Sequence, residues 1–168
     1  MHPMIRFSIQ STIYRRIIKP IIFQIDPEAV HDFTVKLAEL VGKTPIKYIL
    51  PLLFSYQNPM LSQNLLNAQF KNPLGLAAGF DKSGKLTSIL PYTGLGHFEV
   101  GSVTYKKHLG NPKKRVWRMP KHKSLQIYYG MPNLGAVDVE KRLKNKKVKI
   151  PYSISIAATP TKENLNID

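Results

Sequence analysis

The sequence of 168 residues contains no cysteine. Disulfide bonds and thiolate metal sites are therefore excluded. Acidic residues are also scarce, because 10 Asp and Glu stand against 25 Lys and Arg, which gives a formal net charge of +15. An excess of this size predicts an anionic partner, and a lipid surface, a nucleic acid or an acidic ligand would each satisfy it.

Long apolar runs are missing as well. No segment reaches the roughly 20 residues of a membrane-spanning helix, and the N-terminus lacks the apolar region and cleavage site of a signal peptide. The five histidines are scattered without metal-ligand spacing, and we expect His31 to be a surface or capping residue of a helix. Apolar residues nevertheless make up 43% of the chain, which predicts a packed core.

The positive charge is concentrated in two segments, Lys106–Lys123 and Lys141–Lys149. A run of this kind usually marks the solvated end of a helix. No recognised nucleic-acid-binding motif accompanies either segment, so a nucleic-acid binder is the function class with the least support.

Amphipathic helices are expected near the N-terminus. The first has an apolar stripe opposite a basic face; the stripe is Ile13, Tyr14, Ile17, Ile18 and Ile21, and the cations are Arg15, Arg16 and Lys19. Pro20 should break or bend this helix. A second helix has Asp26 as its N-cap, Pro27 in its first turn and Gly42 at its end, and a third begins at Pro45. Three small helices cannot enclose a core, so they either cap the following domain or sink their apolar face into a lipid interface.

The stretch Lys71–Lys82 reads Lys-Asn-Pro-Leu-Gly-Leu-Ala-Ala-Gly-Phe-Asp-Lys. Its apolar run between Pro73 and Gly79 predicts a buried strand that ends in a glycine turn. Small residues at that end let a flat ligand lie against the backbone. Asp81 and Lys82 follow at once and should form a charge pair at the C-terminal mouth of the strand, where parallel α/β folds build their sites.

A nucleotide-binding loop is a second interpretation of the same stretch. Gly79 to Lys85 fits the pattern G-x-x-x-x-G-K. Leu86, however, stands where a Ser or Thr should hold Mg²⁺. The metal hydroxyl is part of the mechanism, so the pattern argues against a nucleotide site.

Further elements are expected on either side of this stretch. Leu61–Phe70 predicts a hairpin with Asn67 near its turn, and His97–Thr104 predicts a second strand. Between them, the apolar residues Leu86, Ile89 and Leu90 suggest a helix stopped by Pro91.

The Lys71–Lys82 stretch resembles the first barrel strand of the quinone-linked (class 2) dihydroorotate dehydrogenases, flavoproteins of pyrimidine synthesis. In that family the Ala-Gly backbone lies against FMN, and the lysine contacts both flavin and orotate. The resemblance therefore implies cofactor contacts at Ala78, Gly79 and Lys82, and a substrate contact at Lys82.

Three other stretches carry the same resemblance. The family's second strand, Glu-x-Gly-Ser/Thr-Val-Thr, has a hydroxyl that contacts FMN, and Ser102 stands at that position. Gly110–Arg118 follows the family's Gly-Asn-x-x-Pro-Arg-x-x-Arg loop, although Lys114 replaces the proline. The pattern Phe-x-x-Asp-Pro-Glu-x-x-His, from Phe23 to His31, resembles the extension of the class 2 enzymes, which carries the quinone tunnel and the membrane contact. The resemblance therefore implies a membrane quinone as the electron acceptor. It also implies a peripheral location on an anionic membrane surface, which in a bacterium would be the cytoplasmic side.

The resemblance decays where the family binds orotate. The family has Asn-x-Met-Gly-Phe-Asn-Asn around the orotate ring, and here Ile127 and Pro132 replace two of the asparagines. Its third strand ends in Asn-x-Gly-Lys-Asn, and here Ser155 and Ala158 replace the first asparagine and the lysine. We therefore expect weak orotate binding, with Lys82 as the one strong contact.

Over the chain, the resemblance implies an α/β fold, the front part of a TIM-type (β/α)₈ barrel behind a helical extension. Residues 1–56 would be the extension, and residues 57–168 would form about three βα units. The implied activity is FMN-dependent oxidation of dihydroorotate to orotate in UMP synthesis, with electrons passed to a quinone. The family's catalytic serine would lie beyond Asp168, so no catalytic residue and no metal site are assigned to this chain.

Three functions remain as hypotheses. The first is a dihydroorotate dehydrogenase that is truncated or is the front part of a split enzyme. In that case we expect the isolated chain to retain no FMN and to be inactive, until another chain supplies the rest of the barrel. The second is a non-catalytic, membrane-associated or partner-binding relative. The third is the nucleic-acid binder.

Overall fold

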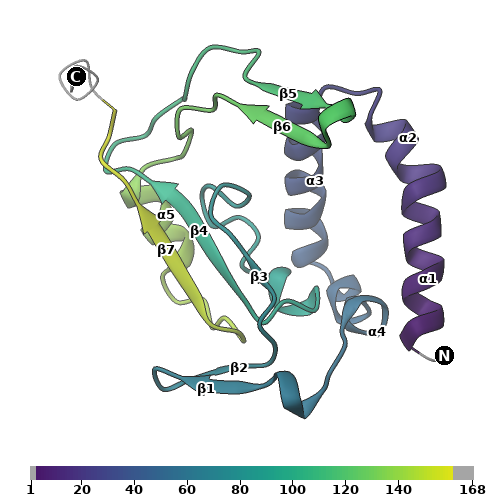
Figure 1. Ribbon diagram of the computed structural model, residues 1–168. Helices are drawn as coiled ribbons and strands as arrows, with labels where there is room; N and C mark the ends of the chain where they lie inside the picture. The colour runs from purple at the N-terminus through teal and green to yellow at the C-terminus, as the bar shows by residue number, and fades with distance from the viewer. Residues whose placement is uncertain (1–2, 161–168) are drawn as a thin grey trace.

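The computed structural model describes residues 3–160 (Figure 1). Residues 1–2 and 161–168, which belong to the outer ends of the two predicted domains, lie outside the described residues. Six α-helical or π-helical segments and a three-stranded parallel sheet form the larger part of the fold. The helical segments are α1 (Pro3–Ile13), η1 (Tyr14–Ile18), α2 (Lys19–Ile22), α3 (Pro27–Gly42), α4 (Leu50–Phe54) and α5 (Ala136–Leu143).

The segments α1, η1 and α2 form one continuous helical rod that stands beside α3 (Figure 1). Its middle, Tyr14–Ile18, is a π-helix. Pro20 has no N–H to bond the carbonyl of Arg16, and a π turn is one way for a helix to absorb that loss. The expected disturbance is therefore present, but the helix continues past it. No helix among residues 3–160 is long and apolar enough to cross a membrane.

The capping predicted for the second helix is confirmed. The Asp26 carboxylate accepts the backbone N–H groups of Glu28 and Ala29, both at 3.0 Å. The helix runs from Pro27 to Gly42. The expected third helix is split, because a 3₁₀ turn at Pro45–Tyr48 precedes α4.

The sheet has the order β3–β4–β7, with both pairs parallel. Its strands are β3 (Gly75–Leu76), β4 (His97–Val103) and β7 (Tyr152–Ile156). The prediction of β4 is confirmed. The prediction that the first strand is buried is wrong: only two residues pair, and both Leu74 and Ala77 are exposed. Among the described residues no strand pairs with the outer edge of β3 or of β7, so the sheet does not close into a barrel.

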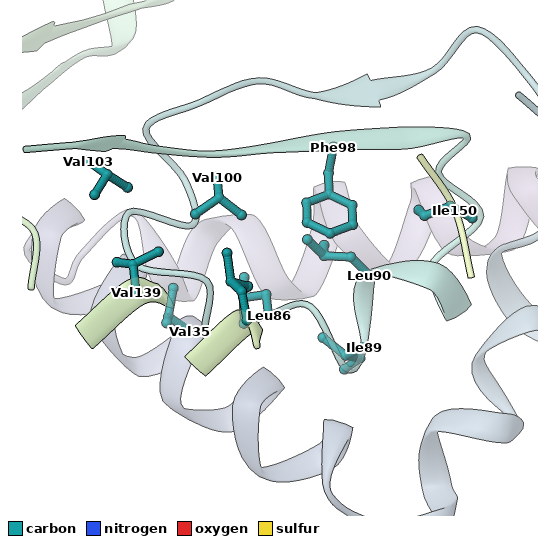
Figure 2. Packing of buried hydrophobic residues seen from close by; sticks show 10 residues of the cluster. Val35, Leu86, Ile89, Leu90, Phe98, Val100, Val103, Val139 and Ile150 are labelled. Carbon is teal, nitrogen blue, oxygen red and sulfur yellow. The ribbon is translucent and has the colours of Figure 1, made fainter. Parts of the chain in front are cut away.

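The core lies on one face of the sheet. Phe98 and Val100 of β4 are fully buried and point toward a layer of apolar side chains from segments before and after β4 in the chain (Figure 2). The cluster contains Val35, Leu86, Ile89, Leu90, Phe98, Val100, Val103, Val139, Leu143 and Ile150. The helix expected around Leu86 is wrong, because turns and a short 3₁₀ segment, Leu90–Tyr92, occupy this stretch. Its apolar residues reach the core without forming a helix.

Two hairpins flank the sheet. The expected one is confirmed as β1 (Gln63–Leu65) and β2 (Ala68–Phe70), and its turn residues Leu66 and Asn67 both have positive φ. The other hairpin, which was not predicted, consists of β5 (Val116–Met119) and β6 (Ser124–Ile127). This second hairpin lies at the end of the sheet toward which β4 and β7 point (Figure 1).

Candidate functional site

A cavity of about 740 Å³ lies at the carboxyl ends of β3 and β4, bounded by the N-terminal helices and the β5–β6 hairpin. Its wall is largely apolar, with a few cations and hydroxyl groups. The lining residues are Tyr14, Ile22, Pro27, Val30, His31, Thr34, Ala78, Gly79, Phe80, Lys82, Gly101, Ser102, Val116, Arg118, Leu125, Ile127, Tyr129, Met131 and Pro132. The four residues predicted to contact cofactor or substrate, Ala78, Gly79, Lys82 and Ser102, therefore line one cavity.

The backbone at Gly79 is held close to the end of β4. The Gly79 N–H donates to the Gly101 carbonyl at 2.7 Å, and the Gly101 N–H donates to the Asp81 carbonyl at 3.0 Å. Gly79 has φ +103°, and a Cβ built there would meet no atom within 4 Å. The strand end therefore presents bare backbone to open space, as a site for a flat ring requires.

Ser102 sits beside a register shift between β4 and β7. Its hydroxyl lies 2.9 Å from the Ser155 hydroxyl, so the two predicted flavin-side positions are in direct contact. Gly101 has φ +125°, and a Cβ on it would lie 2.5 Å from the Ser155 carbonyl oxygen. A side chain at Gly101 would therefore force β4 and β7 apart at the cavity.

Lys82 points along the cavity wall rather than toward Asp81. Its ammonium lies 4.0 Å from the centre of the Tyr129 ring. Burial lowers the pKa of Lys82, although the carboxylates of Asp32 and Glu28 oppose that shift. A partly desolvated cation of this kind is suited to binding an anionic ligand.

The expected charge pair between Asp81 and Lys82 is not formed. Asp81 is buried, and its carboxylate accepts the backbone N–H groups of Lys85 and Leu86, both at 2.8 Å. This bonding fixes the turn after β3. It also occupies the amides that a phosphate-binding loop would need, which removes the nucleotide interpretation of this stretch.

Tyr129 is a cavity residue with two cation contacts that the sequence analysis did not single out as a site residue. Its ring contacts Lys82 and also lies 5.1 Å from the Arg115 guanidinium carbon. Burial, followed by the nearby carboxylates of Glu28 and Asp32, raises the pKa of Tyr129 to about 12. The phenol is therefore a neutral hydrogen-bond donor at physiological pH.

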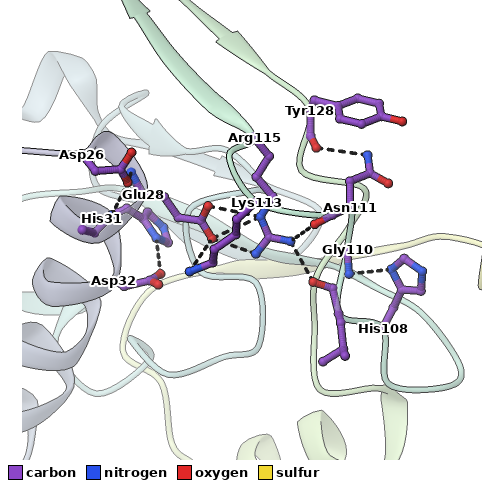
Figure 3. A network of polar contacts seen from close by, with 12 residues as sticks. Asp26, Glu28, His31, Asp32, His108, Gly110, Asn111, Lys113, Arg115 and Tyr128 are labelled. Carbon is purple, nitrogen blue, oxygen red and sulfur yellow. Dashed lines mark hydrogen bonds and ion pairs between the residues drawn. The ribbon is translucent and has the colours of Figure 1, made fainter.

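A buried ion pair between Glu28 and Arg115 joins α3 to the loop before β5 (Figure 3). Arg115 Nη2 lies 2.7 Å from Glu28 Oε1, and Arg115 Nη1 donates to the carbonyls of Leu109 and Asn111 at 2.8 and 2.9 Å. Lys113 adds a longer contact of 3.5 Å to Glu28. Both Glu28 and Arg115 belong to motifs noted in the sequence, but the pairing of two residues 87 positions apart could not be read from it.

His31 does not cap α3, and its side chain is half-buried rather than freely solvated, with 18% of it exposed. Its Nε2 atom lies 2.9 Å from the Phe80 carbonyl oxygen and its Nδ1 atom 3.2 Å from the Asp32 carboxylate. The ring also packs edge-on against Phe80. His31 thereby ties α3 to the turn that carries Lys82. The part of the chain that the structure describes contains no group of three or more potential metal ligands.

Arg118 closes the side of the cavity next to α2. Its guanidinium donates to the Ile25 carbonyl and lies 4.8 Å from the centre of the Phe23 ring. Ile127 and Pro132, which stand at the positions of the two missing asparagines, also line the cavity. The cavity wall therefore contains two cations, Lys82 and Arg118. It has apolar side chains, Ile127 and Pro132, at the positions where the resemblance implies asparagine amides.

Comparison with known proteins identifies the family to which this chain belongs. A family model described as dihydroorotate dehydrogenase matches residues 60–168. The chain belongs to the dihydroorotate dehydrogenase family. Within the family, it is 39% identical over 148 residues to the dihydroorotate dehydrogenase (quinone) of Nitratiruptor sp. and 37% identical over 161 residues to that of a Synechococcus strain.

The match to these dihydroorotate dehydrogenases covers most of this chain but less than half of theirs. The alignments take in 86% and 90% of this chain and 42% and 43% of the two relatives. A crystal structure of the Eimeria tenella DHODH in complex with ferulenol superposes with a TM-score of 0.67 at 33% identity, over 80% of this chain and 36% of that one. The chain is thus an α/β part of the quinone-type fold in which the barrel is not closed.

Proposed function

We propose that this chain forms the flavin-facing and orotate-facing front part of a quinone-linked dihydroorotate dehydrogenase. The strands β3, β4 and β7 would be the first three of a (β/α)₈ barrel, with residues 1–56 as the helical extension and 57–168 as the barrel part. One observation carries the proposal. Ala78, Gly79, Lys82 and Ser102, chosen from motifs in separate strands, line a single cavity at the strand ends.

The residues present fit one side of an FMN ring. Gly79 offers backbone without a side chain, and the hydroxyls of Ser102 and Ser155 provide donors beside it. FMN, when bound, would supply the hydride acceptor for oxidation of dihydroorotate to orotate and pass the electrons to quinone. Lys82 would hold the anionic substrate and stabilise negative charge, because its ammonium is partly desolvated next to Tyr129.

The open edge of β7 supports the need for further polypeptide. A groove of about 550 Å³ runs between β7 and α5. Tyr152, Ile154 and Ile156 of β7 are exposed, and Ile156 is 83% exposed. An uncovered apolar strand of a parallel sheet normally packs against a helix and a neighbouring strand. We propose that the rest of the barrel, supplied by another polypeptide segment, covers this edge.

Complementation tests the proposed activity. Residues 1–168 would be co-expressed with the part of the Nitratiruptor enzyme that this chain does not match, and quinone-dependent oxidation of dihydroorotate would be measured. We expect turnover only in the complex and none for either part alone. Lys82→Met should abolish the turnover, whereas Lys85→Met, whose side chain does not line the 740 Å³ cavity, should leave it largely intact. Equal activity of the two variants would contradict the role of Lys82.

A non-catalytic relative is the second candidate, and the cavity wall favours it in one respect. Ile127 and Pro132 stand where the family has asparagines around orotate, and Tyr129 fills part of the space next to Lys82. A partner-binding or membrane-binding role would tolerate these changes. Complexes that hold FMN but show no turnover with dihydroorotate would favour this second candidate.

Membrane contact is proposed for the N-terminal rod. Its apolar stripe is exposed in the structure, including Ile17 and Ile21, and Arg15, Arg16 and Lys19 are exposed as well. Each cation near an anionic surface contributes about 1 kcal/mol. We therefore expect Arg15→Gln/Arg16→Gln/Lys19→Gln to weaken binding to phosphatidylglycerol vesicles by roughly a hundredfold at low salt.

Flotation of vesicles would measure this loss. The matched control is Lys121→Gln/Lys123→Gln/Lys141→Gln, which removes the same charge from exposed positions elsewhere. The control should bind nearly as well as the parent chain. Equal losses in both variants would show that net charge, not the helical rod, governs binding.

A further inference from the structure

A smaller cavity shares no lining residue with the cavity at the carboxyl ends of β3 and β4, and its wall is strongly basic. It has a volume of about 150 Å³ and is built by three separate segments of the chain. The lining residues are Lys47, Thr87, Ser88, Pro91, Tyr92, Lys146, Lys147, Val148 and Lys149. Four of these are lysines, and none of the described residues in the wall is a carboxylate.

Three of the lysine ammonium groups contact neighbouring groups of the protein. Lys146 Nζ donates to the Thr87 hydroxyl at 3.0 Å. Lys47 Nζ donates to the Gly42 carbonyl at 2.9 Å and lies 5.7 Å from the centre of the Tyr92 ring. Lys149 Nζ lies 5.9 Å from the same ring. These contacts restrict the side chains before a ligand arrives, which lowers the entropic cost of binding one.

The nearest carboxylates are engaged elsewhere. Glu39 accepts a hydrogen bond from Lys43 at 3.1 Å and faces Arg142 at 3.9 Å. Asp81 uses both oxygens on backbone amides. Burial, followed by the positive charge of Arg142, lowers the pKa of Lys146, while the carboxylates of Asp81 and Glu39 oppose that shift. Four lysines thus line one small cavity with no carboxylate among the described residues of its wall, and an anion placed among them would be attracted to all four charges.

We propose that this cavity is a binding site for a phosphate group. Lysines bind phosphate as point charges, and the hydroxyl of Ser88, which also lines the cavity, can donate a further hydrogen bond to its oxygens. The small volume suits one phosphate group rather than a nucleic-acid strand, which needs a long groove and stacking platforms. The group belongs to either a free phosphate compound or a phospholipid head group. The site does not depend on the proposed dehydrogenase function.

Titration with inorganic phosphate at constant ionic strength tests this site. We expect saturable binding to the 168-residue chain by calorimetry. Lys146→Gln/Lys149→Gln should weaken it by at least about tenfold, because two charge-assisted contacts are lost. The control Lys141→Gln/Lys144→Gln lies in the same lysine run, removes the same charge and leaves the cavity wall intact, so its affinity should stay within about twofold of the parent.

Two further measurements make the result decisive. Lys147→Gln removes one wall cation, and it should weaken phosphate binding without altering the urea midpoint of unfolding. Flotation with phosphatidylglycerol vesicles distinguishes the sources: a loss in the site variant beyond the control identifies a lipid head group, and an unchanged flotation identifies a free phosphate compound. Equal phosphate affinities of the site and control variants, or binding that does not saturate, would overturn the proposal.

Discussion

In a complex completed by the missing part of the barrel, Ile127→Asn with Pro132→Asn is expected to raise the affinity for orotate by about a hundredfold. Orotate is small, polar and anionic, so its amide and carbonyl groups must find partners when they leave water. Ile127 offers none, and Pro132 lacks both an amide side chain and a backbone N–H. Each missing partner costs roughly 1–3 kcal/mol. Both residues line the cavity, so asparagine at these positions can reach a ligand in it.

Orotate titration of the complex, followed by the flavin absorbance, would measure the gain. The control is Leu125→Asn with Met131→Asn, because these apolar residues also line the cavity but do not stand at the asparagine positions of the family. The control should gain little affinity. Tight orotate binding by the unmodified complex would contradict the alignment of this stretch and the view that the pocket is degenerate.

Removal of the Glu28 carboxylate is expected to destabilise the chain by about 3–5 kcal/mol, the usual result when one partner of a buried ion pair is lost. Glu28 is 6% exposed and Arg115 is 8% exposed. In Glu28→Ala the Arg115 guanidinium keeps its two carbonyl partners but loses its counter-ion. The pair joins α3 to the loop before β5, so the wall of the 740 Å³ cavity should loosen as well.

Urea unfolding of Glu28→Ala would measure this loss as a change in the free energy of unfolding. Glu39→Ala provides the comparison, because Glu39 pairs with the exposed Lys43 and such surface pairs contribute about 0–1 kcal/mol. A loss in Glu28→Ala no larger than that in Glu39→Ala would show that the buried pair does not hold the helices to the sheet.

The local parts of the fold were predictable because their signals are local. Asp26 and Pro27 specify the start of α3, and the short segment from His97 to Thr104 specifies the strand β4. The turn of the β1–β2 hairpin is likewise encoded by Asn67 and its neighbour. In each case a few adjacent residues decide the outcome, so no knowledge of distant contacts is needed.

The failures have a different physical origin. The apolar residues around Leu86 indicate burial correctly but not helix, because the Asp81 carboxylate binds the amides at Lys85 and Leu86 and shapes a turn instead. The run before Gly79 was expected to be buried, but burial depends on a neighbouring strand that the described residues do not provide. Local composition cannot report such contacts.

The candidate site shows the same difference between local signals, which were predictable, and long-range contacts, which were not. The four residues taken from strand motifs line one cavity, yet the role of Tyr129 depends on the spatial approach of Lys82 and Arg115. The Glu28–Arg115 pair spans 87 positions and could not be inferred from either motif alone. Long-range pairing of this kind is the part of the site that only the structure supplies.

The flavin spectrum of the purified protein tests the central claim most directly. We propose that the cavity at the strand ends provides one face of an FMN site, but among the described residues the edges of β3 and β7 are open and the barrel is incomplete. We therefore expect the 168-residue chain to be colourless after purification with added FMN, and its complex with the complementing segment to carry stoichiometric flavin. A stoichiometric flavin spectrum from the chain alone, or a stable complex without flavin, would contradict the account.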